Sequence, residues 1–118
     1  MTNQEAFDKM VAHLRKQGKP ARDVNGVCRY RTKDGLMCAV GCLLTDDEYK
    51  RGMEGMCVDA LLPAYGVLQD LDPPFLAKMQ DTHDAWDPSH WEARFADTAA
   101  RYGLVYVPAT SIQPTTPA

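Results

Sequence analysis

Four cysteines are the side chains with the most versatile chemistry in this sequence. Structural zinc takes four thiolate or imidazole ligands in a tetrahedral array, so these thiols, with or without a histidine, are candidate ligands. The spacing argues against zinc, because no pair has the Cys-x2-Cys separation of a zinc knuckle. Cysteines among leucine, methionine and valine more often act as small core residues. We therefore predict inert core cysteines and no metal or cofactor; the four are Cys28, Cys38, Cys42 and Cys57.

A thiol nucleophile is the second chemistry that these residues allow. Cys38 would lie near the start of a short helix, where the helix terminus lowers the pKa of a thiol. Catalysis would also need a base, and the distance of the three histidines, at positions 13, 83 and 90, from Cys38 in the sequence neither supports nor excludes them. No Gly-x-Cys elbow and no oxyanion-hole glycines are evident in the sequence. The sequence therefore predicts no catalytic residue.

Carboxylates and imidazoles gather where two helices are expected to meet. Such a group could hold a divalent cation through oxygen and nitrogen ligands. The simpler interpretation is two helix ends carrying caps and solubilising charge. The residues concerned are Asp81, His83, Asp84, Asp87 and His90.

Basic side chains alternate along Val27–Arg31 and offer a candidate binding surface. Arg29 and Arg31 would share one strand face, about 6–7 Å apart, which suits a clamp on a phosphate or carboxylate. Tyr30 would face the core, and Lys33 follows in the next turn. The competing interpretation is an edge strand that charge protects against aggregation. We predict a binding site formed by Arg29, Arg31 and Lys33.

The elements that position these residues follow from periodicity and turn signals. Apolar residues at helical spacing and a capping box predict a first helix from Thr2 to Gly18. Residues 27–31 and 36–38 are expected to pair as an antiparallel hairpin around an Asp-Gly turn. Short helices are expected over 45–51 and 58–62. Residues 38–44 fit either a buried strand or a short buried helix; we favour the helix, in which Gly41 predicts close packing or a bend. Longer helices are expected over 73–86 and 88–102, with a short strand ending at 107.

The predicted fold class is therefore α+β and mainly α-helical. Five or so helices pack on a small two-stranded antiparallel hairpin, in a single globular domain over residues 1–107. Residues 108–118, rich in proline and threonine, are predicted to form an extended or disordered tail.

Length and composition limit the function classes. A chain of 118 residues fits one domain, which excludes a two-lobed enzyme, a Rossmann dehydrogenase or a barrel. Its longest apolar stretch has nine residues, whereas a membrane span needs about 20. The N-terminus lacks the basic and apolar regions of a secretory signal, so we expect a cytoplasmic location and no membrane partner.

Charge is distributed unevenly along the chain. Residues 1–33 carry eight basic and three acidic side chains, a net +5, whereas the remainder carries five basic and 13 acidic side chains, a net −8. The basic part could attract an anion or an acidic partner, although a solvated helix face and loop is the simpler explanation. The overall charge of −3 argues against general coating of DNA.

One segment carries a distinctive pattern. Residues 28–43 contain Cys-x-Tyr-Arg, an Asp-Gly turn and Cys-Ala-x-Gly-Cys-Leu, and Met53-Glu54-Gly55 follows. Over roughly residues 27–60 the chain resembles a family of small uncharacterised proteins from tailed phages and prophages. The resemblance implies kinship but no reaction, because a shared fold does not define a function.

These observations predict a phage or prophage accessory protein in the bacterial host cytoplasm. It would act by stoichiometric binding to a host or defence macromolecule, inhibition included. Two alternatives stay open: capture of a small anionic ligand or nucleotide, and a small zinc- or thiol-dependent enzyme.

Overall fold

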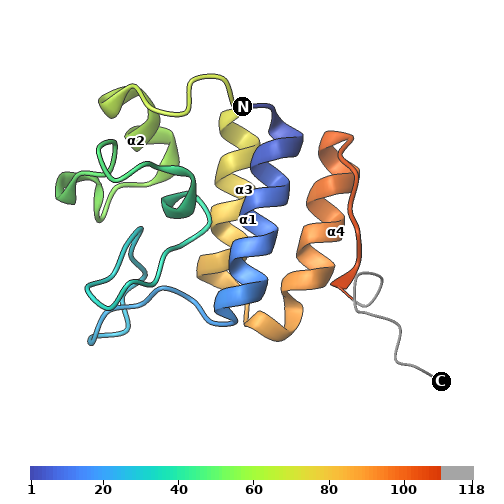
Figure 1. Ribbon diagram of the computed structural model, residues 1–118, viewed down its shortest axis with the longest axis horizontal. Coiled ribbons are helices and arrows are strands. Elements are labelled where there is room, and N and C mark those ends of the chain that lie inside the picture. Colours follow the sequence, from blue (N-terminus) through green and yellow to red (C-terminus); the bar gives the residue numbers. More distant parts are fainter. Residues whose placement is uncertain (110–118) are drawn as a thin grey trace.

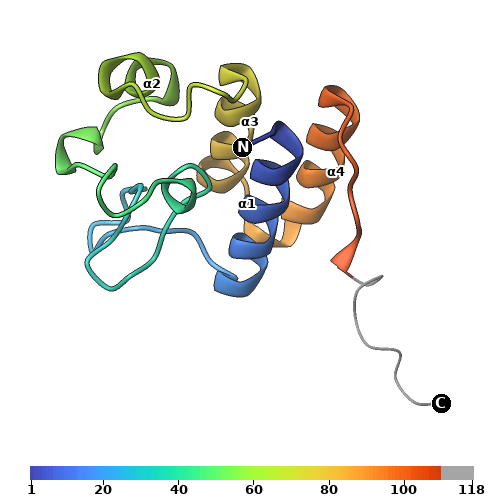
Figure 2. The same ribbon diagram turned by 45° about the horizontal axis from the view of Figure 1, so that its top comes forward.

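A computed structural model describes residues 1–109 of the protein, and this part is α-helical. It contains the helices α1 (Asn3–Gln17), α2 (Val58–Tyr65), α3 (Pro73–Ala85) and α4 (Trp91–Tyr102), and the 3-10 turns Gly41–Leu43, Arg51–Met53 and Pro88–His90. Helices α1, α3 and α4 stand side by side (Figure 1). The long connection from α1 to α2, together with α2, lies on the opposite side of α3 from α4 (Figures 1 and 2).

Helix α1 confirms the first predicted helix at both ends. The Thr2 hydroxyl accepts a hydrogen bond from the Glu5 amide at 3.1 Å, and the Glu5 carboxylate accepts one from the Thr2 amide at 2.8 Å. This capping box satisfies two amides that the first helical turn leaves unpaired. Gly18 ends the helix at φ 70°, a left-handed conformation that glycine adopts without strain.

Helices α3 and α4 share an apolar core with α1, and residues of α2 and of the connection from α1 to α2, such as Leu61 and Val40, complete it. The Phe75 ring of α3 lies 6.5 Å from the Phe7 ring of α1 and 5.7 Å from the Tyr102 ring of α4. Both helices were expected near these positions, and Gly103 ends α4 as predicted. The last helix differs only at its start, where a 3-10 turn capped by Asp87 precedes it.

The predicted hairpin is wrong, and with it the α+β fold class and the packing of five or so helices on a sheet. Residues 1–109 contain no strand, and two isolated bridges, Arg22–Cys28 and Arg31–Met37, each close a separate turn. The backbone amides of Tyr30 and Arg31 bond the Glu54 carboxylate instead of a neighbouring strand. Backbone bonds from Cys38 to the Tyr30 carbonyl and from Thr32 to the Leu36 carbonyl still join the two segments, but the Glu54 side chain takes the amides that a longer ladder of strand pairs would have used.

The strand expected at residues 102–107 is absent for a similar reason. This segment is extended after Gly103, but the Val105 amide and carbonyl both bond the side-chain amide of Gln4, at 2.8 and 3.0 Å. A single glutamine thus takes the place of a neighbouring strand.

The short predicted helices are only partly correct. The 38–44 segment reduces to the 3-10 turn Gly41–Leu43, and the 45–51 segment forms a turn although the Thr45 and Glu48 capping bonds are present. Residues 45–47 are all exposed, so a helix there would have no apolar face to pack. Helix α2 continues through Pro63 and ends at Tyr65, before the left-handed Gly66. Proline has no N–H for the carbonyl of Asp59, four residues earlier, but Asp59 is exposed and water can bond that carbonyl.

Two further sequence expectations concern the ends and the environment of the chain. The predicted tail lies, from residue 110 onward, outside the described residues. None of the helices in residues 1–109 combines the length and apolar character that crossing a membrane requires.

Candidate functional site

The connection from α1 to the first 3-10 turn holds the predicted binding residues on two tight turns. In the first turn the Asp23 carboxylate accepts hydrogen bonds from the amides of Asn25 (2.9 Å) and Val27 (3.1 Å) and from Arg29 Nε (2.9 Å). These bonds, the Val27 amide foremost, lower the pKa of the Asp23 carboxyl. The turn is therefore fixed in shape, and Val24 at its tip is fully exposed.

The second turn is closed by Thr32. Its backbone amide donates to the Leu36 carbonyl at 2.9 Å, and its hydroxyl accepts from the Leu36 amide at 3.0 Å. Gly35 provides the left-handed position at φ 89°, and the exposed Lys33 lies beside it. Lys33 is thus displayed on a second rigid turn, as a binding role would require.

Arg29 and Arg31 do not form the predicted clamp on one strand face. The Arg29 side chain is 42% exposed and pairs with Asp23 through Nε. The Arg31 side chain is only 18% exposed; its Nη1 bonds Asp46 at 2.7 Å, its Nη2 bonds the Leu44 carbonyl, and its guanidinium lies 5.1 Å from the Tyr49 ring centre. Arg31 thus ties the loop to residues 44–49, whereas Arg29 and Lys33 remain open to solvent.

Glu54 is the residue that sequence reasoning missed. Its carboxylate accepts from the amides of Tyr30 (2.9 Å) and Arg31 (3.1 Å) and from the Tyr49 hydroxyl (2.5 Å). These bonds hold the segment around Tyr30 against residues 49–54. No spacing rule connects positions 54 and 30, so the sequence carried no signal for this contact.

The four cysteines differ in burial and in their hydrogen bonds. Cys38 and Cys42 are buried; the Cys38 sulfur accepts from the Gly41 amide at 3.2 Å, and the Cys42 thiol donates to the Ala39 carbonyl at 3.0 Å. Burial raises the pKa of both thiols, that of Cys42 to about 12, so neither is an activated nucleophile. The core prediction is wrong for Cys57, which is exposed, and Cys28 is half-buried.

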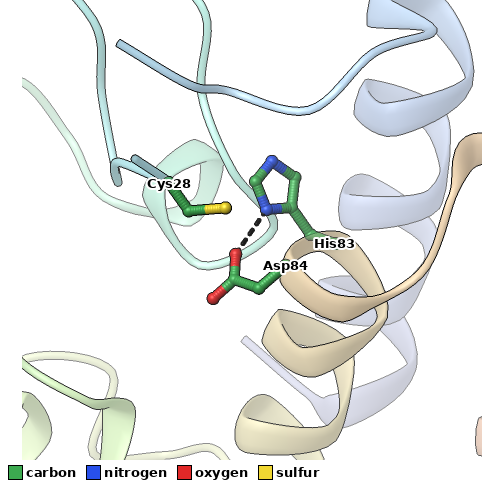
Figure 3. Close-up of side chains that lie close together, drawn as sticks. All are labelled: Cys28, His83 and Asp84. Carbon is green, nitrogen blue, oxygen red and sulfur yellow. Dashed lines mark hydrogen bonds and ion pairs between the residues drawn. The ribbon is translucent and has the colours of Figure 1, made fainter. Parts of the chain in front are cut away.

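One group with metal-ligating side chains forms among residues 1–109, and it unites Cys28 with His83 and Asp84 (Figure 3). The ligand atoms of the three residues lie within 4.8 Å of one another. His83 is fully buried; its Nδ1 lies 2.6 Å from Asp84 Oδ1, and its Nε2 lies 2.8 Å from the Ala21 backbone nitrogen. Since a backbone N–H only donates, Nε2 must accept this hydrogen bond. In the neutral ring Nδ1 then carries the hydrogen and donates it in the hydrogen bond to Asp84.

This tautomer opposes both metal binding and base catalysis at the cluster. A metal on Nδ1 would move the ring proton to Nε2, where it would face the Ala21 N–H. The only ring lone pair is likewise taken by Ala21, so it is not available to accept a proton from Cys28. Burial raises the pKa of the Cys28 thiol, outweighing the opposite effect of Arg22 beside it. His83 is thus a hydrogen-bonded support for the loop.

Asp87 and His90, which were also predicted to belong to the cation group, make other contacts. Asp87 caps the turn before α4 by accepting from the Ser89 amide at 3.0 Å, and the His90 ring lies 5.9 Å from the Trp86 ring, edge to face. Of the five predicted residues, the structure unites only His83 and Asp84 in the cluster.

Comparison of the chain with protein-family models, curated proteins and solved structures gives no match. The resemblance to tailed-phage proteins therefore stays a prediction, and the geometry of the chain itself carries the functional argument.

Proposed function

We propose that the protein acts by stoichiometric binding to another protein, through a surface on the two turns that follow α1. This double-turn surface comprises Arg22, Val24, Val27, Arg29 and Lys33. The resemblance to phage and prophage proteins suggests a host or defence protein as the partner.

The exposed tip of the first turn is the observation that carries this proposal. Val24 is fully exposed and Val27 is 56% exposed, on a turn that the Asp23 carboxylate locks with three hydrogen bonds. A side chain displayed on a rigid turn loses little conformational freedom on binding, so more of its contact energy appears as affinity. An apolar tip on such a support is therefore suited to enter a pocket of a partner.

The charges around this tip favour an acidic partner. Arg22 and Lys33 are exposed, and the Arg29 side chain, which bonds Asp23 through Nε, is 42% exposed. Guanidinium and ammonium groups around an apolar contact guide a carboxylate-rich surface into place and exclude basic competitors. The net charge of +5 on residues 1–33 acts in the same direction.

A matched pair of valine substitutions tests the proposal. Val24→Asp introduces a negative charge into the double-turn surface, and Val105→Asp introduces the same charge at another exposed valine, outside that surface. Both variants are expected to fold, which thermal unfolding checks. Each of the three proteins is then used as bait in a bacterial host lysate. The wild type and Val105→Asp should retain the same partner, and Val24→Asp should lose it.

The purified partner then decides stoichiometry and strength. Titration calorimetry should give one partner per chain, with affinity at least about tenfold weaker for Val24→Asp. Arg29→Ala with Lys33→Ala should weaken binding and reduce its dependence on salt. Equal binding by the two aspartate variants would exclude the double-turn surface as the contact.

A further inference from the structure

We infer that the protein forms a dimer in which the double-turn surface of each copy docks into a groove along α2 of the other copy. This α2 groove consists of two adjoining hollows, an apolar one beside the end of α2 and an acidic one between α2 and α3. The contact uses the same double-turn surface as the proposed function, but it needs no foreign partner.

The apolar hollow lies between α2 and the segment that leads into α3. Its volume is about 410 Å³, and its walls are mostly aliphatic, with Leu62, Val67 and Leu71 among them. These three side chains also belong to the core, so the hollow is a shaped and supported part of the surface. An apolar side chain that enters it from outside removes apolar area from water, which favours association.

The acidic hollow adjoins the apolar one, because Asp59 lines both. Its volume is about 250 Å³, and Asp81 and Asp84 of α3 form its acidic side. No basic residue of the described chain lines either hollow. Asp59 and Asp81 are exposed, and neither has an ion-pair partner within residues 1–109. These carboxylates therefore attract a cationic group from another molecule.

The double-turn surface has the complementary composition. Val24 at its tip is fully exposed, and the exposed Arg22 and Lys33 supply positive charge. An apolar tip flanked by cations matches an apolar hollow flanked by carboxylates. The charge of the chain is divided in the same way, with +5 over residues 1–33 and −8 over the remainder. Because both sides of this match belong to one chain, a second copy of the chain is the occupant that the charges favour.

The placement of the two surfaces suits a two-fold dimer. The double-turn segment and α2 lie on the same side of α3, with the turns toward one end of that side and α2 toward the other (Figures 1 and 2). A two-fold rotation that brings this side against a second copy places the turns of each copy opposite α2 of the other. The contact then occurs twice, and the second contact forms within a complex that the first already holds. A foreign partner would have to compete with the second copy for the double-turn surface.

Analytical ultracentrifugation of the purified wild type tests whether the dimer exists. At low salt the average mass should rise from that of the monomer toward that of the dimer between about 10 µM and about 1 mM protein. Addition of NaCl to about 0.5 M should shift this rise to higher protein concentration, because salt screens the exposed charges.

Two charge reversals test which surfaces meet. Lys33→Glu and Asp59→Lys each place like charges opposite one another in the contact, and each should weaken dimerisation at least about tenfold. Both residues are exposed, so both variants are expected to fold, which thermal unfolding checks. In an equimolar mixture the two reversed charges can face each other. The mixture should therefore form dimers that neither variant forms alone.

Arg101→Glu is the matched control, because it makes the same charge change as Lys33→Glu at an exposed position of α4, on the other side of α3. It should dimerise like the wild type. It should also draw no more of a fluorescently tagged Asp59→Lys into dimers than the wild type does, whereas Lys33→Glu should draw in more.

A wild type that stays monomeric at about 1 mM and low salt would overturn the inference. So would a dimer that neither reversal weakens, or a mixture of the two reversals that shows no rescue. These measurements use only the purified chain, whereas the proposed function is tested on a partner from lysate. Failure of the dimer is therefore distinguishable from failure of the binding proposal.

Discussion

Two regions of the described chain are held together by different kinds of interaction. The helical half, α1, α3 and α4, is joined by apolar side chains that contact several neighbours at once, among them Phe7, Phe75 and Phe95. The loop half, residues 18–57, also contributes apolar side chains such as Val40 and Met53 to the core, but its backbone is held in addition by individual polar side chains. Gln17 bonds both the amide and the carbonyl of Met37, at 2.9 Å each, and Gln80 accepts the Val40 amide at 3.1 Å.

The difference teaches where single contacts matter most. In the helical half each buried apolar side chain contacts many others, so the stability is spread over many contacts. Replacing one polar group there leaves those contacts intact. A backbone amide of the loop half has one acceptor, and the loss of that acceptor leaves a partly buried donor unpaired. Contacts to backbone in the loop half should therefore be more sensitive to substitution than polar contacts in the helical half.

Gly41→Ala is expected to have the largest effect. A Cβ at Gly41 would lie 2.0 Å from the Tyr30 carbonyl oxygen and 2.8 Å from its carbon, and these backbone atoms cannot rotate away. The loop would have to separate from the 3-10 turn, which we expect to lower the free energy of unfolding by about 3 kcal/mol. Urea denaturation measures this change.

Gly52→Ala is the matched control for that substitution. A Cβ there meets only the Tyr65 hydroxyl, at 2.4 Å, and this is the end of a side chain that can move into solvent. Its effect should stay below about 1 kcal/mol. Equal destabilisation by the two alanines would show that the contact between Gly41 and Tyr30 is not what holds the loop half.

Glu54→Gln is expected to have the next largest effect. The Glu54 carboxylate accepts two backbone amides, and a glutamine would direct its own NH₂ group at one of them. We expect a loss of about 2 kcal/mol, measured by urea denaturation, with faster hydrogen exchange at Tyr30 and Arg31. Glu48→Gln, in an exposed capping bond, is the control and should change stability by less than about 1 kcal/mol. Unchanged exchange at both amides would contradict the role of Glu54.

The same difference explains how much of the fold could be predicted from the sequence. The limits of α1 follow from signals within a few residues of each end, the Thr2–Glu5 capping box and Gly18. The ends of helix α4 are likewise marked by nearby residues, a proline just before its start and Gly103 at its end. Such elements are encoded by neighbours in sequence, so periodicity and capping rules identify them.

The loop half and the cluster could not be predicted in this way. Glu54 lies 24 positions from Tyr30, and His83 lies 62 positions from Ala21. No local rule pairs a carboxylate or an imidazole with a distant backbone amide. The alternation of Arg29 and Arg31 indicated a strand because the local sequence gives no sign that Glu54 would bond the backbone amides of this segment in place of a second strand.

Glu92→Gln tests the comparison from the helical half and should have the smallest effect. Glu92, like Glu54, accepts three hydrogen bonds, two from Arg15 at 2.7 and 2.8 Å and one from the Tyr106 hydroxyl at 2.7 Å. The donors of these three bonds belong to side chains, and a backbone contact from Ala109 contributes least to lowering the Glu92 pKa. The carboxylate is also 41% exposed, so water can replace its partners. We expect a loss of at most about 1 kcal/mol at neutral pH, measured by urea denaturation.

The pH dependence of that loss gives the sharper test. The hydrogen bonds from Arg15 hold the pKa of the Glu92 carboxyl below its ordinary value. A lowered pKa in the folded state stabilises the protein above the pKa of the unfolded chain, and this contribution disappears as the pH falls through the lowered value. The difference between wild type and Glu92→Gln should therefore shrink on acidification. Glu92→Gln could instead destabilise the protein as much as Glu54→Gln. The number of hydrogen bonds would then matter more than whether their donors belong to the backbone. The distinction between the two halves would be wrong.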